Sequence, residues 1–289
     1  AAKWLKQKNA DVREMYSPPR IVQEAGLRLY GGKRLRPGWS LDLTVDDPET
    51  GKPWDLSDGK IRSKVVNLIT EGKPFVLILS PMCTAFSQIQ AINKGRRDPA
   101  IVRRELDEAK DHIRWVMRLC AMQARANRYL VFEHPAIAMS WEMAEIKKVR
   151  EMQGVVRVKF DMCQFGMEAI DPADGTAKPV QKQTAVLTNS CEIAKRLCRE
   201  CPNRKGDKSL HHQHLKLEGG TRCKQAQVYP RDFCRTICEG VSAQRRLDAM
   251  NLVALNIMSM EELHAFGHDD LHDDHMSDND YEAYDDATN

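Results

Sequence analysis

The chain has 289 residues, of which 42% are hydrophobic and 29% are charged, and its formal net charge is +3 at pH 7. This length suffices to bury a full core, and no apolar run reaches the roughly 18 residues that cross a bilayer, which excludes a membrane-spanning chain. The nine cysteines are an odd number, and six of them lie between Cys191 and Cys238, which favours a reducing compartment over a disulfide scaffold. We therefore expect a soluble, intracellular protein that makes no contact with membranes.

The first part of the chain predicts strands that alternate with helices. Residues 11–30 are typical of a strand, a turn and a helix, with Ser17 as the N-cap and Pro18 at the first helical position. The next predicted elements are a strand over 38–43, a third strand ending at 54–56, a helix over 58–72 and an apolar strand over 74–80.

The pattern continues in the second part of the chain. The predicted elements there are a helix over 99–127, a strand from Tyr129, strands over 155–161 and 186–188, and a helix over 232–263. Such alternation is typical of an α/β fold, so we expect a Rossmann-like, doubly wound and mostly parallel sheet with helices on both faces.

Two of the predicted strands end in chemically reactive groups. The apolar strand over 74–80 leads into Pro81-Met82-Cys83, and the strand from Tyr129 leads into Glu133. Because α/β enzymes place their chemistry just past the carboxyl ends of such strands, Cys83 is a candidate nucleophile and Glu133 a candidate acid. The alternatives are a buried core cysteine and a carboxylate that caps a helix.

The order of several short motifs resembles the cytosine-C5 DNA methyltransferases. The chain has a Pro-x-Cys-x-x-Phe-Ser loop at 81–87 and a Glu-x-Pro loop at 133–135. Cys-Gln-Phe-Gly at 163–166, Lys-Gln-Thr at 182–184 and Leu-Thr-Asn at 187–189 follow, as in phage members of that family. The resemblance covers residues 11–240, and it lies in the ordered set because each motif alone is unspecific.

The resemblance implies a fold of the class I methyltransferase type and transfer of a methyl group from S-adenosylmethionine to C5 of cytosine in DNA. Cys83 matches the residue that adds to C6 of the base, and Glu133 matches the acid at N3. Lys182 and Thr184 match residues that hold the cytosine and the catalytic loop.

The predicted cofactor site departs from the family. The first strand of the family ends in a glycine turn, whereas here it leads into Ser17-Pro18-Pro19-Arg20, and proline has no N–H to offer a ligand. Acidic residues after the second and third strands suit the ribose and the adenine. The predicted cofactor contacts are therefore Tyr16, Ser17, Pro18, Asp42, Asp55 and Pro81.

Composition and the resemblance together predict how the chain divides. The expected parts are a catalytic domain over 1–189, a Cys/His-rich insert over 190–228, a helical segment over 229–263 that closes the catalytic domain, and an acidic flexible tail over 264–289.

Charge favours a nucleic-acid partner. Eleven of the 41 acidic residues and none of the 44 basic ones lie in 261–289, which leaves residues 1–260 with a net charge of +14. The basic side chains that follow Cys83 and suit phosphate contacts are Lys94, Arg96, Arg97, Arg103 and Arg104. The alternatives to a DNA methyltransferase are an inactive nucleic-acid-binding module of a viral or mobile-element polyprotein, and the same chemistry on RNA.

A second cluster of residues has the ligand types of a zinc site. Cys198-x-x-Cys201 is followed by three histidines and by Cys223. The preferred ligand set is Cys198, Cys201, His212 and His214, with Cys191 and Cys223 in reserve. The alternative is a group of free thiols in a basic loop.

Overall fold

The computed structural model describes residues 4–87, 97–204, 208–217 and 225–266, without the side chains of Arg204 and 255–266. Residues 1–245 form one compact unit and residues 246–289 another. The first unit contains the predicted catalytic part, the Cys/His-rich segment and the start of the last helix. None of the described helices combines the length and the apolar character needed to cross a membrane.

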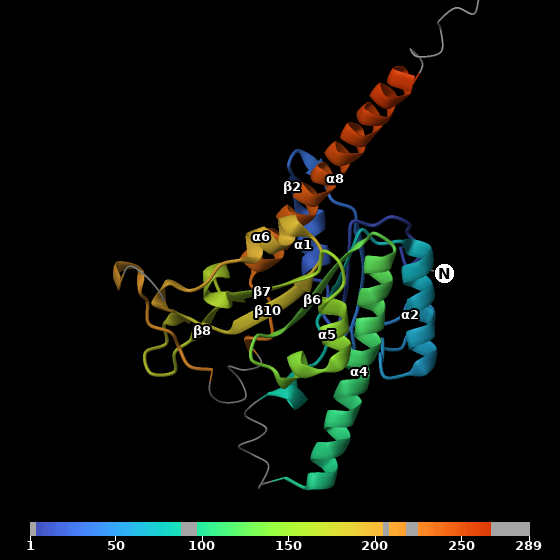
Figure 1. Ribbon diagram of the computed structural model, residues 1–289. Coiled ribbons are helices and arrows are strands. Elements are labelled where there is room, and N and C mark those ends of the chain that lie inside the picture. Colours follow the sequence, from blue (N-terminus) through green and yellow to red (C-terminus); the bar gives the residue numbers. More distant parts are fainter. Residues whose placement is uncertain (1–3, 88–96, 205–207, 218–224, 267–289) are drawn as a thin grey trace, which may run out of the picture. The chain divides into compact units, whose positions relative to one another are not determined.

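The centre of the first unit is a six-stranded sheet (Figure 1). Its strands are β1 (Val12–Met15), β4 (Pro37–Leu41), β5 (Val76–Leu79), β6 (Tyr129–Pro135), β7 (Val156–Asp161) and β10 (Gln183–Thr188). They lie in the order β4-β1-β5-β6-β10-β7, with β4, β1, β5 and β6 parallel and β10 antiparallel to both of its neighbours. The expected α/β fold with a mostly parallel sheet is confirmed.

Helices cover both faces of the sheet (Figure 1). They are α1 (Ile21–Leu27), α2 (Gly59–Gly72), α4 (Pro99–Arg125), α5 (Ala144–Arg150), α6 (Cys191–Leu197) and α8 (Arg231–Phe266). One core packs α2, α4 and α5 against the sheet, and the other packs α1, α6 and the first turns of α8 against it. In β5, Leu77 and Leu79 face the first core while Val76 and Ile78 face the second, which explains the unbroken apolar run.

Short elements connect these layers. They are the hairpins β2 (Leu29–Tyr30) with β3 (Lys33–Arg34) and β8 (Glu168–Ile170) with β9 (Ala177–Pro179), and the 3-10 turns η1 (Thr84–Phe86), η3 (Met139–Glu142), η4 (Met162–Phe165), η5 (Pro202–Arg204) and η6 (Lys208–Leu210).

The two long helices that flank the strand of Cys83 start where side chains satisfy their first N–H groups. Asp58 accepts a hydrogen bond from the backbone N–H of Lys60 at 2.7 Å, and Asp98 accepts one from Ala100 at 2.8 Å. Pro99 follows Asp98 at the first helical position, where no N–H is needed. The predicted helices over 58–72 and 99–127 are confirmed.

Two local predictions are wrong. Helix α1 begins at Ile21 instead of Pro18, because the hydroxyl of Ser17 donates to the carbonyl of Pro18 at 2.8 Å and caps no helix. No strand ends near Trp54 within the fully described stretch 43–58, where an isolated bridge between Asp46 and Pro53 is the extended pairing. Trp54 is nevertheless buried in the first core.

Candidate functional site

The ends of β5 and β6 bring Cys83 and Glu133 to the same edge of the sheet. These strands are parallel neighbours with Leu79 opposite Phe132, so the residues that follow them lie side by side. Glu133 continues β6, whereas the chain after β5 turns through Ser80 to Cys83, which precedes η1. The Cys83 side chain is half-buried, so part of it is accessible from outside.

The Glu133 carboxylate is buried and held by an aromatic hydroxyl. Tyr229 Oη lies 2.8 Å from Glu133 Oε2 and 2.6 Å from Ser80 Oγ. Because a carboxylate only accepts, Tyr229 donates to Glu133 and accepts from Ser80. The other oxygen, Oε1, is buried and has no hydrogen-bond partner among the described residues. Within the described part of the chain, this acceptor therefore stays available to a further donor.

Lys182 completes a group of three charged or ionisable side chains. It directly precedes β10, which runs antiparallel to β6 with Thr184 opposite Pro135, so it reaches the edge where β6 ends. Its Nζ donates to the Ala226 carbonyl at 3.1 Å. Burial and the Glu133 charge raise the pKa of Cys83, while the Lys182 charge opposes this rise. The sequence prediction for these three residues thus corresponds to one cluster in space.

Thr184 and His134 support the site from inside the protein. Thr184 is fully buried and its hydroxyl donates to the Lys182 carbonyl at 3.3 Å, so it holds the backbone rather than facing a substrate. His134 lies next to Phe132, Phe86 and Trp141, and its Nδ1 lies 2.7 Å from the Ser140 hydroxyl. Burial lowers the pKa of His134 to about 4, so this imidazole is neutral at pH 7.

Two predicted cofactor carboxylates are engaged by their own turns. Asp42 accepts from the backbone and hydroxyl of Thr44 at 2.9 and 2.6 Å, and Asp55 makes the same pair of bonds with Ser57 at 2.9 and 2.6 Å. Such turns are a common use of aspartate in loops and need no ligand. Pro81 is buried.

The turn after β1 contains a residue in the left-handed backbone conformation, although it has no glycine. Tyr16 has a φ of 64°, and its hydroxyl lies 2.9 Å from His112 Nδ1. A non-glycine residue in this region costs about 1–2 kcal/mol, which this bond offsets. Ser17 and Pro18 follow, one buried and one half-buried.

The amino terminus of α1 is occupied by the chain's own carboxylate. Glu14 accepts hydrogen bonds from the backbone N–H groups of Arg20, Ile21 and Val22 at 2.7, 3.3 and 3.1 Å. These are the donors that a helix start would offer to a ligand. Together with the two prolines and the engaged aspartates, this arrangement does not fit S-adenosylmethionine in the way that the resemblance implies. A cavity of about 370 Å³ nearby is lined by Pro19, Arg20 and Tyr229, among others.

The predicted phosphate contacts divide into three groups. Lys94 and Arg96 lie outside the described residues. Arg97 pairs with Glu105 at 2.6 Å and Arg104 lies 3.8 Å from Glu108. Arg103 is exposed.

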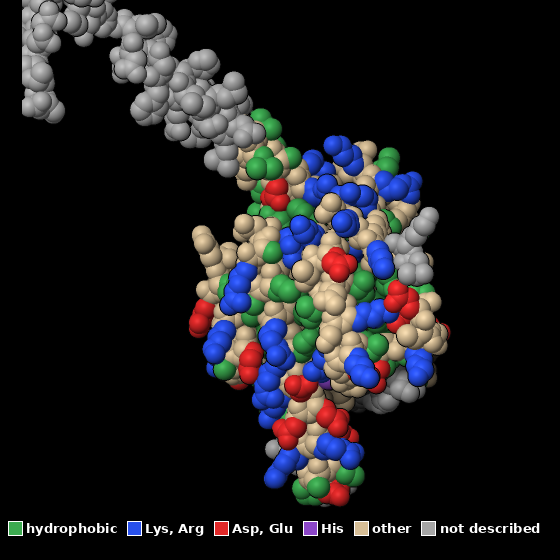
Figure 2. All heavy atoms as spheres, turned by 90° about the vertical axis from the view of Figure 1, so that its right-hand side faces the viewer, with side chains coloured by type: hydrophobic (Ala, Val, Ile, Leu, Met, Phe, Trp, Pro, Cys, Tyr) green, Lys and Arg blue, Asp and Glu red, His purple; other side chains and the backbone are tan. Residues whose placement is uncertain are grey.

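A second basic feature lies between α4 and α5. Lys and Arg side chains are spread over the face that Figure 2 shows, with acidic side chains among them. A groove of about 480 Å³ between the two helices is lined by the exposed cations Arg118, Arg125 and Lys148. The sequence alone did not distinguish these cations from other solvated charges.

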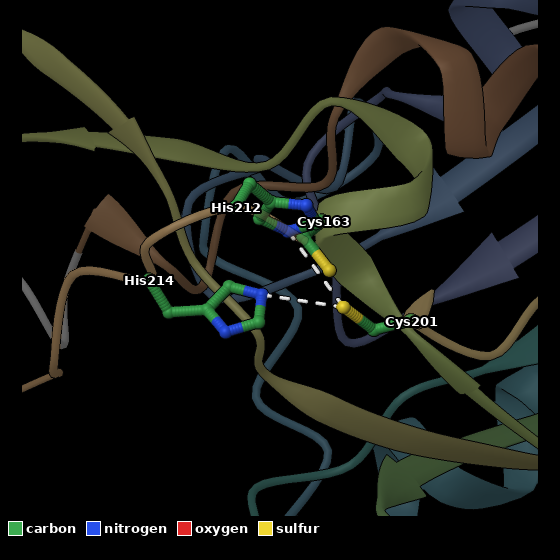
Figure 3. A group of neighbouring side chains, drawn as sticks. All are labelled: Cys163, Cys201, His212 and His214. Carbon is green, nitrogen blue, oxygen red and sulfur yellow. Dashed lines mark hydrogen bonds between the residues drawn. The ribbon is translucent and has the colours of Figure 1, made fainter. Parts of the chain in front are cut away.

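The Cys/His-rich segment forms a compact cluster with one unexpected member (Figure 3). Cys163, Cys201, His212 and His214 place their ligand atoms within 4.8 Å of one another. Cys198, which the sequence prediction included, is exposed and does not belong to this group. Cys163 takes its place, because η4 directly follows β7 and lies against the Cys201 segment. Cys223 lies outside the described residues.

Sequence reasoning missed Tyr229, Ser80 and Glu14 as parts of the site. Tyr229 precedes the last helix and lies almost one hundred positions after Glu133, and no motif signals their contact. The sequence also gives no signal that Cys163 lies with the other three possible metal ligands, although Cys163 opens the Cys-Gln-Phe-Gly motif. No protein-family model matches this chain, and no curated protein matches it either.

Proposed function

We propose that this protein acts on cytosine in DNA by adding the Cys83 thiolate to C6 of the base, the addition that prepares C5 for methylation. The observation that carries the proposal is the grouping of Cys83, Glu133 and Lys182 at one edge of the sheet. Glu133 Oε1 is buried and makes no hydrogen bond to any described residue, and it suits the N3 and amino edge of a cytosine.

Each residue has a defined part in this addition. The Cys83 sulfur forms a bond to C6, and the electrons of the C5–C6 double bond move toward N3, which takes a proton or a strong hydrogen bond from the acid form of Glu133. Tyr229 fixes the orientation of that carboxyl group. Lys182 favours the thiolate over the thiol. The base must leave its stack to reach them, so single-stranded or flipped cytosine is the substrate form.

The methyl donor is where this chain departs from the family it resembles. Glu14 fills the start of α1, and Ser17-Pro18-Pro19 replaces a glycine turn. This observation favours a second candidate function, in which the chain binds nucleic acid through its basic surface without transferring a methyl group. The groove between α4 and α5 supports either function.

Trapping with 5-fluorocytosine separates the two candidates. DNA that contains this base is incubated with S-adenosylmethionine and with wild type or Cys83→Ala, and denaturing gels report covalent adducts. The trap forms only when C5 receives a methyl group, since fluorine cannot leave as a proton does. An adduct in wild type alone supports methylation, and its absence from both, with DNA binding retained, favours the binding module. Calorimetry with S-adenosylmethionine tests the first turn separately.

A further inference from the structure

We propose that Cys163, Cys201, His212 and His214 bind one Zn²⁺ ion in a tetrahedral site that fastens the described residues 199–204 and 208–217 to the end of β7. Two thiolates and two imidazoles are a ligand set that structural zinc sites use. None of its ligands belongs to the Cys83 cluster, so zinc binding can be tested without any action on cytosine.

The ligand atoms have the separations that this geometry requires. Zinc bonds of about 2.3 Å to sulfur and about 2.0–2.1 Å to nitrogen, at tetrahedral angles, place sulfur and nitrogen about 3.6 Å apart. Cys201 Sγ lies 3.7 Å from His212 Nε2 and 3.5 Å from His214 Nε2. Figure 3 shows the two imidazoles directed at the Cys201 sulfur, with the Cys163 sulfur beside it.

Backbone contacts place the ligands around the proposed ion. The Cys201 N–H donates to Asp161 Oδ2 at 2.8 Å, which ties this ligand to the last residue of β7. The Asn203 amide donates to the His212 carbonyl at 2.6 Å and accepts from the His212 N–H at 2.9 Å. Preorganisation of this kind lowers the cost of assembling a metal site.

The segment that carries three of the ligands has little regular structure and few buried side chains to hold it in place. Its described residues 199–204 and 208–217 contain the short turns η5 and η6 and no longer element. Leu215 and Leu217 only partly bury their side chains against the second core. Zinc binding supplies folding free energy where a segment buries too little apolar surface.

One backbone hydrogen bond links the proposed zinc site to the Cys83 cluster. Cys163 follows Met162, whose N–H donates to the Lys182 carbonyl at 3.1 Å. Cys163 lies in η4, directly after β7, and Lys182 directly precedes β10, so this bond holds the two segments together and the metal would stabilise the backbone that carries the Lys182 charge.

Metal analysis of the full chain tests the ligand set. Inductively coupled plasma mass spectrometry is expected to find one zinc per chain in wild type purified with zinc present. Cys163→Ser and His214→Ala should each lose at least about nine-tenths of it. Cys198→Ser is the matched control, because Cys198 is close in sequence to Cys201 but exposed, and it should keep its zinc. Zinc lost from Cys198→Ser but kept by Cys163→Ser would overturn the assignment.

Thiol footprinting of wild type decides the question even if the variants do not fold. Zinc should protect Cys163 and Cys201 from iodoacetamide, while the exposed Cys191 and Cys198 react. Chelation should accelerate alkylation of the two protected thiols by about tenfold or more. Wild type without zinc, or with a Cys163–Cys201 disulfide when freshly purified, would contradict the site. These measurements involve no nucleic acid, so their failure is distinct from failure of the cytosine chemistry.

Discussion

Removal of one hydroxyl group at Tyr229 should weaken both the fold and the site. In Tyr229→Phe, Glu133 loses the bond to Oε2, and its Oε1 already has no partner among the described residues. Loss of this bond to a buried carboxylate costs about 1.5–3 kcal/mol, which is the range for hydrogen bonds to charged groups. For a compact unit of 245 residues, that loss lowers the melting temperature by about 3–6 °C.

Tyr30→Phe provides a matched control with the same chemical change. Tyr30 also donates to a buried glutamate, Glu24, at 3.0 Å. Glu24 keeps Arg28 at 3.0 Å and Arg231 at 3.2 Å after the substitution. We therefore expect a smaller loss of about 1 kcal/mol from Tyr30→Phe. Cys83 reactivity should change in Tyr229→Phe and stay constant in Tyr30→Phe.

A double-mutant cycle isolates the bond itself. Urea unfolding of wild type, Tyr229→Phe, Glu133→Gln and the double variant gives the coupling free energy between the two side chains. We expect about 1.5–3 kcal/mol. A coupling below about 0.5 kcal/mol, or equal losses in Tyr229→Phe and Tyr30→Phe, would refute the view that Tyr229 holds the carboxylate.

The structure predicts the direction of three further effects on thiol reactivity and on stability. Burial and the Glu133 charge raise the pKa of Cys83, and the Lys182 charge opposes this rise. The rate of Cys83 alkylation by iodoacetamide should therefore rise with pH, and the midpoint pH should be lower in Glu133→Gln and higher in Lys182→Met. Unchanged midpoints would show that neither charge acts on the thiol. Burial lowers the pKa of His134 to about 4, so up to about 3 kcal/mol of stability should disappear as the pH falls from about 6.5 to 4. Urea unfolding of His134→Asn should lack that acid loss, and an identical loss would contradict the assignment. Gly240→Ala should lower the free energy of unfolding by about 1–3 kcal/mol, because the added Cβ would lie 2.9 Å from the α6 backbone. This cost exceeds the gain from the better helix propensity of alanine. A gain in thermal stability would show that α6 can shift to make room for the methyl group.

Strands and helices with a strong local signal could be predicted from the sequence. The run from Val76 to Leu79 is apolar because both faces of β5 are buried, and the aspartates before α2 and α4 mark helix starts. The start of α1 could not be predicted locally, because its cap is Glu14 from the preceding strand. The strand predicted to end near Trp54 is a packed loop, because an apolar side chain can be buried equally well from either.

In the candidate site, too, some residues could be predicted from the sequence and others could not. Cys83 follows β5 and Glu133 lies in the last part of β6, its parallel neighbour, so two motifs at strand ends indicated one shared edge of the sheet. Tyr229 and Cys163 reach their clusters through tertiary contacts between distant segments, which spacing in the sequence does not encode. Cys198 suited a zinc knuckle by spacing alone, yet the chain presents it to solvent.

Exchange of the hydrogen at C5 of cytosine tests the central chemistry most directly, because it needs no methyl donor. Addition of Cys83 to C6 lets C5 take a proton from water and lose its own hydrogen before the sulfur leaves. With single-stranded DNA that carries tritium at C5 of cytosine, wild type should release tritium into water without S-adenosylmethionine. Cys83→Ser and Glu133→Gln should release it at least about 100-fold more slowly. Release by wild type at the rate of Cys83→Ser, with DNA bound in both, would contradict the account.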